Sequence, residues 1–98
     1  MKLSMLANSY LEWMIKSYST DHNRMFHWEQ IRDQFKDEDK EFICDAYRLL
    51  AHDGLVINRW ADDHVYICQL QVNAIRDAEE NTKLVQTYAI LKEIRSWI

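Results

Sequence analysis

Six residues in the sequence belong to the types that most often bind zinc or act as nucleophiles. They are Cys44, Cys68, His22, His27, His52 and His64. A structural zinc site usually draws its ligands from closely spaced pairs, and these residues form no knuckle that combines C-x2-C with H-x3-H. The sequence therefore predicts neither a metal site nor a bound cofactor.

One cysteine and one histidine share a predicted helix, but their spacing does not suit catalysis. Cys44 and His52 are eight residues apart, which is about 12 Å along a helix axis and too far for a nucleophile and its base. The chain also has no glycine-rich phosphate loop and no nucleophile elbow. We therefore expect the protein not to be an enzyme.

The acidic residues are concentrated in one segment. Residues 28–45 hold seven acids and three bases, so this segment accounts for the formal net charge of −4, and the rest of the chain holds nine of each. The acids that we predict to form a docking face for a basic protein surface are Asp37, Glu38, Asp39, Glu41 and Asp45. Helix capping and solvation are the simpler explanation of the same acids.

Three basic residues are candidates for contacts with nucleic acid. On the helix predicted over 39–53, Arg48 could form hydrogen bonds with the edge of a guanine, and Lys40 could contact a phosphate. Arg59 lies in the following hairpin. The outward residues of that helix are predicted to be Lys40, Glu41, Cys44, Asp45, Tyr47 and Arg48. Carboxylates on this surface repel the phosphates that supply most non-specific affinity, and DNA-binding domains usually show a basic face.

The hairpin also carries Trp60, beside acidic residues. We expect it either to pack across the hairpin against Tyr66 or on the first helix, or to be an exposed aromatic anchor for a partner.

The spacing of apolar residues predicts helices that would position these side chains. Apolar residues recur at helical spacing over 1–18, on an arc wide enough to be covered from two sides. Shorter helices are predicted over 28–35 and 39–53, and Gly54 stands where a left-handed cap commonly ends a helix.

After Gly54 the apolar period changes to two. The β-branched and aromatic runs at 55–60 and 65–70, joined by 61–64, predict a hairpin over 55–70. Helix, short helix, helix and hairpin is the order of a winged helix-turn-helix, so we predict an α+β winged-helix domain that comprises residues 1–98.

The remaining segment, 72–98, is predicted to be an amphipathic helical segment. Its wide apolar face either packs on the first helix or joins a second copy of the chain. The candidate dimer residues are Leu84, Tyr88, Leu91, Ile94, Trp97 and Ile98.

Composition restricts the class of protein. A hydrophobic content of 48% argues against disorder, and no apolar run approaches the roughly 18 residues that a membrane span needs. The start of the chain lacks the pattern of a secretion signal. We therefore expect a cytoplasmic protein without a membrane partner.

Two stretches resemble a known family. The segment 43–56, with its helix end at Gly54, is similar to the third-helix segment of the YjcQ-type proteins, and the ending 88–98 is similar to their closing helix. The acidic pair Asp62–Asp63 before an aromatic strand also fits, although 70–74 lacks the Thr and Gly that such proteins usually have. The resemblance implies a small winged-helix protein from Gram-positive bacteria or their prophages. It implies no enzyme activity and no known binding residues.

Two functions follow as hypotheses. In the first, the acidic helix-turn-helix docks on a basic protein surface, for example as a phage inhibitor of a host nucleic-acid-binding protein. The alternative is a small dimeric DNA-binding transcriptional regulator that uses the third helix and the hairpin.

Overall fold

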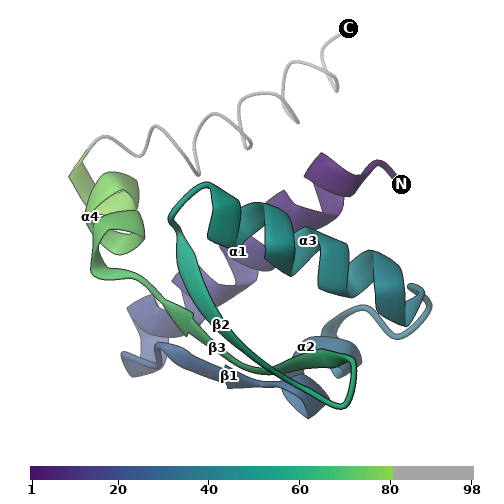
Figure 1. Cartoon of the computed structure of the whole chain (residues 1–98). Coiled ribbons are helices and arrows are strands. Elements are labelled where there is room, and N and C mark those ends of the chain that lie inside the picture. The colour runs from purple at the N-terminus through teal and green to yellow at the C-terminus, as the bar shows by residue number, and fades with distance from the viewer. Residues whose placement is uncertain (81–98) are drawn as a thin grey trace, which may run out of the picture.

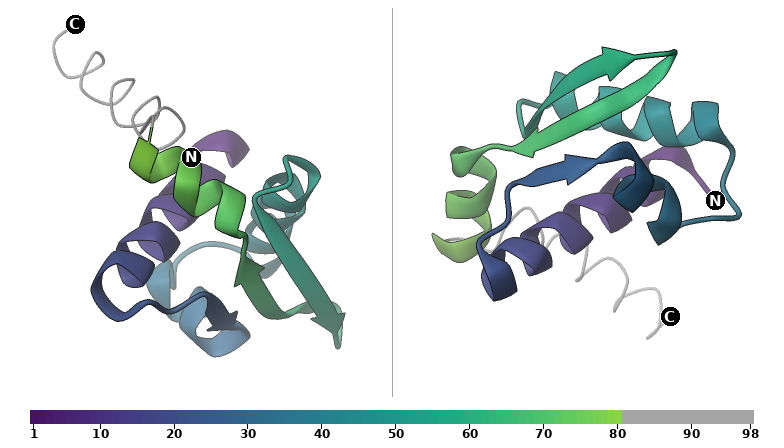
Figure 2. Two further views of the ribbon diagram at one scale, coloured as in Figure 1. Left: turned by 90° about the vertical axis from the view of Figure 1, so that its left-hand side faces the viewer. Right: turned by 90° about the horizontal axis from the view of Figure 1, so that it is seen from below.

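Helices α1 and α3 cover one face of a three-stranded antiparallel sheet (Figures 1 and 2). The computed structural model describes residues 1–80. In chain order they form α1 (Leu3–Asp21), β1 (Met25–His27), α2 (Trp28–Gln34), α3 (Lys40–His52), β2 (Val56–Ala61), β3 (His64–Leu70) and α4 (Val72–Glu80). The sheet order is β1-β3-β2. The described part of the chain is thus an α+β fold with four helices.

Helix α1 is covered from two sides, which accounts for its wide apolar arc. Tyr10 contacts Tyr47 of α3, with ring centroids 4.9 Å apart, and Trp13 contacts Phe26 of β1 at 5.0 Å. These contacts pack α1 against α3 on one side and against β1 on another, and α1 supplies much of the buried core.

The end of α1 lies three residues beyond the predicted limit of 18. The turn-forming residues after Tyr18 stay helical until His22, which adopts a left-handed conformation with φ of 57°. Its N–H donates to the Tyr18 carbonyl at 2.7 Å. A left-handed residue that satisfies a late carbonyl in this way ends a helix.

Helix α2 follows β1 without an intervening loop. The His27 N–H donates to the Gln30 side-chain oxygen at 2.9 Å, which fixes the start of the helix. The Tyr10 hydroxyl donates to the Ile31 carbonyl at 2.7 Å and holds α2 against α1. The helix ends one residue before the predicted limit of 35, because Phe35 has a non-helical backbone.

Helix α3 has well-defined caps at both ends. The Asp39 carboxylate accepts the Glu41 N–H at 3.1 Å, as N-cap residues do. At the other end Gly54 has a φ of 75°, and the Leu55 N–H donates to the Leu50 carbonyl at 3.0 Å. This is the left-handed ending that the sequence predicts for Gly54.

Two residues that were predicted to point outward from α3 are buried, and that prediction is wrong. Cys44 and Tyr47 are both fully buried. Tyr47 packs on Tyr10 of α1 and its hydroxyl lies 3.8 Å from the Met14 sulfur, whereas Cys44 contacts the backbone of Val65 in β3. Because α3 lies between α1 and the hairpin, more of its circumference is covered than a one-sided helix would require.

Strands β2 and β3 form the predicted hairpin, with a shorter turn than predicted. The strands extend to Ala61 and from His64, so only Asp62 and Asp63 form the turn. Both have positive φ, at 52° and 64°, as a two-residue hairpin turn of type I′ requires. Val56 pairs with Leu70 and faces the helices.

Strand β1 was not predicted. It comprises three residues, and Phe26, which pairs with Cys68, is its one fully buried side chain. Three residues are too few to show an alternating period, so the sequence reveals only the apolar pair Met25–Phe26.

Helix α4 buries Ala74, Ile75 and Ala78. The rest of the helical segment predicted over 72–98, including every candidate dimer residue, lies outside the described residues. Within residues 1–80 no helix has the length and apolar character to cross a membrane.

Candidate docking surface on helix α3 and the hairpin

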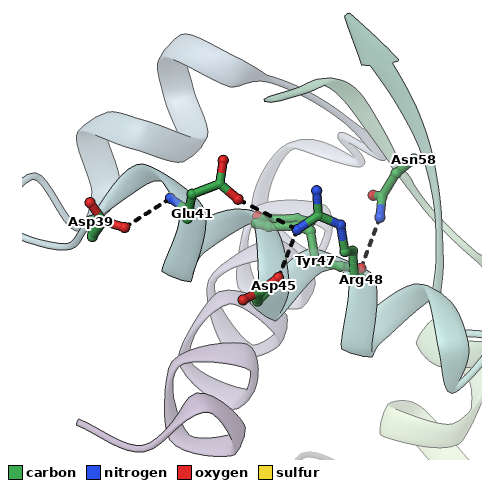
Figure 3. A network of polar contacts seen from close by, with 6 residues as sticks. All are labelled: Asp39, Glu41, Asp45, Tyr47, Arg48 and Asn58. Atoms are coloured by element: carbon green, nitrogen blue, oxygen red, sulfur yellow. Dashed lines mark hydrogen bonds and ion pairs between the residues drawn. The ribbon is translucent and has the colours of Figure 1, made fainter. Parts of the chain in front are cut away.

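The exposed side of α3 carries charges of both signs, and we call it the α3 face. It comprises Lys40, Glu41, Asp45 and Arg48, all of which are exposed. Figure 3 shows the last three of them. The Asp39 cap marks where the helix begins, and the packing of Ile43, Ala46 and Leu50 in the core leaves these four side chains on the outer side.

Arg48 is held by contacts within the chain. Its Nη1 lies 2.6 Å from an Asp45 carboxylate oxygen and 3.9 Å from a Glu41 oxygen (Figure 3). Its guanidinium carbon lies 4.6 Å from the centre of the Trp60 ring. The one arginine on α3 thus has two carboxylates and an aromatic ring around it.

These contacts weaken the case that Arg48 contacts a base. Exposed ion pairs contribute about 0.2–1 kcal/mol and an exposed cation–π contact about 0.5–1 kcal/mol. A good arginine–guanine contact contributes about 1–3 kcal/mol of discrimination. Releasing Arg48 would therefore offset much of the gain from binding a guanine, and would leave Glu41 and Asp45 unpaired beside the phosphates.

Asn58 attaches the hairpin to α3. Its Nδ2 donates to the Tyr47 carbonyl at 2.8 Å (Figure 3), and its Oδ1 is buried without a hydrogen-bond partner. In the β2–β3 register Asn58 pairs with the buried Cys68, so it lies on the face of the hairpin that meets the helices. This bond fixes the distance between the hairpin and α3.

Trp60 matches neither predicted alternative in full. Its ring lies against Arg48 rather than against Tyr66 or α1, and 42% of the residue stays exposed. It belongs to the hairpin face that meets α3, because it pairs with the buried Val65. The residue both holds Arg48 and contributes apolar surface next to the α3 face.

The predicted acids occupy two places. Glu41 and Asp45 lie on α3, whereas Asp37, Glu38 and Asp39 lie in the loop before it. Asp39 serves as the helix cap, and the Glu38 N–H donates to the Phe35 carbonyl at 3.1 Å. Capping therefore explains Asp39, and Glu41 also lies in the first turn of α3, where the helix dipole favours an acid. Asp45 instead forms an ion pair with Arg48.

The three candidate nucleic-acid residues do not share one surface. Lys40 and Arg48 are on α3, whereas Arg59 pairs with Ile67 in the hairpin, and His27 of β1 pairs with the same residue. Side chains alternate between the faces of a strand, so this row lies on the sheet face opposite the helices. The structure separates Arg59 from the two basic residues of α3.

The sequence did not reveal a groove where the hairpin end meets α2. This open groove, the tip groove, has a volume of about 500 Å³ and is lined by His27, Trp28, Glu29, Asp62, His64 and Tyr66. The rings of Trp28 and His64 are stacked, with centroids 4.8 Å apart and planes 18° from parallel. Its residues come from distant parts of the chain and share no local motif, so only the tertiary fold reveals it.

The buried thiols and phenols have the properties of core residues. Burial raises the pKa of Cys68 to about 12 and also raises the pKa of Cys44. Burial likewise raises the pKa of Tyr47 well above its usual value. A thiol needs its deprotonated form to act as a nucleophile or metal ligand, so neither cysteine is suited to such a role at neutral pH. Within residues 1–80 no group of three or more His, Cys, Asp or Glu residues could hold a metal ion.

Comparison of the chain with protein-family models, curated proteins and solved structures finds no match. The resemblance to the YjcQ-type proteins therefore stays a prediction from the sequence.

Proposed function

We propose that this chain is a winged-helix docking module that binds a basic surface of another protein. The winged-helix assignment is supported by the order helix, strand, helix, helix and hairpin, with the first strand pairing beside the hairpin. The observation that carries the choice is Arg48, which the two carboxylates of the α3 face hold and so keep from a DNA base. Together with Lys40 these side chains carry no net formal charge, so the acidic excess of this surface comes from the loop before α3 and from the hairpin turn.

The other charges of this surface point the same way. The turn of the hairpin, which in a winged helix lies near the DNA backbone, consists of Asp62 and Asp63. Arg59 does not compensate for these acids on the α3 side, because it lies on the opposite face of the sheet. A phage or prophage setting, a cytoplasmic location and self-association through 84–98 stay predictions from the sequence.

The test measures fluorescence anisotropy with two labelled probes, a mixed-sequence DNA duplex and an arginine- and lysine-rich peptide. Each is titrated at low and at physiological salt. We expect binding of the peptide that weakens with salt, and no saturable binding of the duplex. Saturable duplex binding with a steep salt dependence would instead establish the DNA-binding alternative.

A pair of matched variants locates the peptide site. Glu41→Gln with Asp45→Asn removes two charges from the α3 face, and Glu79→Gln with Glu80→Gln removes two from the exposed end of α4. We expect the first double variant to weaken peptide binding by about tenfold, and the second by less than about twofold. Equal losses would mean that the peptide responds only to net charge, which would contradict a defined docking face.

A further inference from the structure

The tip groove combines flat aromatic surface with negative charge. The stacked rings of Trp28 and His64 form one part of its wall, and Tyr66, which is 52% exposed, forms another. The carboxylates come from two different elements, Glu29 from the first turn of α2 and Asp62 from the hairpin turn. None of the six described residues that line the groove is lysine or arginine.

This combination has a known chemical preference. Aromatic faces attract cations through their electron-rich centre, and a planar guanidinium can stack on a ring while its N–H groups reach carboxylates. Phosphate-bearing ligands are disfavoured, because Glu29 and Asp62 would repel them. Arg59, which lies on the same face of the sheet as His27, does not line the groove.

The protein already holds one guanidinium in this way. Arg48 lies 4.6 Å from the ring of Trp60 and is paired with Asp45 and Glu41. The tip groove presents the same set of groups, aromatic rings with two carboxylates, without a lysine or arginine among its lining residues.

We propose that the tip groove binds the guanidinium group of an arginine side chain on the partner protein. The proposal rests on the proposed function and adds a second contact with the same basic partner, since His27 of the groove lies on the sheet face opposite α3. Arginine is favoured over lysine because its planar group can stack and form paired hydrogen bonds at the same time.

The test is an NMR titration of the full chain with N-acetyl-arginine amide. The matched probe is N-acetyl-citrulline amide, which has a similar shape and a neutral urea group. We expect saturable shifts at Trp28, His64 and Tyr66 with a Kd on the order of 10 mM for arginine, and no saturation with citrulline. Equal binding of citrulline, or equal binding of the lysine analogue, would overturn the assignment to guanidinium.

Variants assign the binding to the groove. Glu29→Gln with Asp62→Asn removes its two charges, and asparagine tolerates the positive φ of residue 62. Asp63→Asn is the control, since it removes a charge from the same turn but not from the groove lining. We expect at least a fivefold loss of affinity for the double variant, a loss of about threefold or more for Tyr66→Ala, and less than twofold for the control. A loss as large for Asp63→Asn as for the double variant would show attraction to a generally acidic turn and would overturn the proposal.

The two proposals fail in different ways. If the α3 face does not dock on proteins, the Glu41 and Asp45 variants leave peptide binding unchanged while the arginine probe still binds in the groove. If the groove does not bind arginine, the probe gives no saturable shifts, whatever the peptide does on the α3 face.

Discussion

The Arg48 site and the tip groove lie on the same hairpin and differ in where their cation comes from. Around Trp60, the chain supplies the guanidinium itself, from α3. Around Trp28 and Tyr66, the described lining residues supply rings and carboxylates only. The difference shows that aromatic rings and carboxylates can stabilise the fold at one site, where they bind an arginine of the chain. At another site the same groups stay available to a ligand. Four experiments would break or sharpen this comparison.

The largest effect is expected for Phe26→Ala. Phe26 is fully buried against Trp13 and holds β1, and β1 leads directly into Trp28. We expect a loss of about 3–5 kcal/mol in the free energy of unfolding, measured by urea denaturation. Met25→Ala, at a residue that is 41% exposed, is the control and should cost less than about 0.5 kcal/mol. Similar costs at both positions would show that β1 does not anchor the groove.

Asn58→Asp tests the attachment of the hairpin to α3. A carboxylate cannot donate to the Tyr47 carbonyl, so we expect a loss of about 1–3 kcal/mol at neutral pH. The same substitution at Asn73, whose exposed amide donates to the Gly54 carbonyl at 3.3 Å, should cost only a few tenths of a kcal/mol. Equal effects in thermal denaturation would indicate that the bond from Asn58 does not hold the hairpin.

A double-mutant cycle on Arg48 and Trp60 measures the filled site directly. With Arg48→Ala and Trp60→Ala, we expect a coupling of about 0.5–1 kcal/mol from urea denaturation. The cycle of Arg48 with Asp45 should give about 0.5 kcal/mol or less and should shrink in high salt. A coupling energy of zero between Arg48 and Trp60 would show that the Arg48 site is not a model for arginine binding in the tip groove.

The smallest expected effect is an increase in the stability of the protein. Asp63→Gly relieves a positive φ in the hairpin turn, and we expect it to stabilise the protein by about 0.5 kcal/mol. Asp53→Gly is the control, because residue 53 has a φ of −81° and glycine offers no relief there. The arginine probe should bind Asp63→Gly as it binds the wild type, so lower affinity would show that the turn shapes the groove.

The sequence was informative where structure depends on local patterns. Gly54 indicated the end of α3, and the change of apolar period after it indicated the hairpin. Acidic residues likewise indicated the beginning of α3. It was wrong for Cys44 and Tyr47, because helical spacing does not tell how many neighbours cover a helix. It missed β1 and the tip groove, because both depend on pairing with β3, which is distant in sequence. The charge pattern predicted an acidic face, but not that Glu41 and Asp45 hold Arg48.

The position of β3 at the centre of the sheet has a consequence for the order of assembly. Its pairing with β2 is local, so the hairpin can close quickly, whereas its pairing with β1 closes a long loop of chain. Trp28 directly follows β1, so the pairing of β1 with β3 is what brings its ring against that of His64. The groove therefore exists only in the finished domain, and a partner that recognises it distinguishes folded molecules from partly assembled ones.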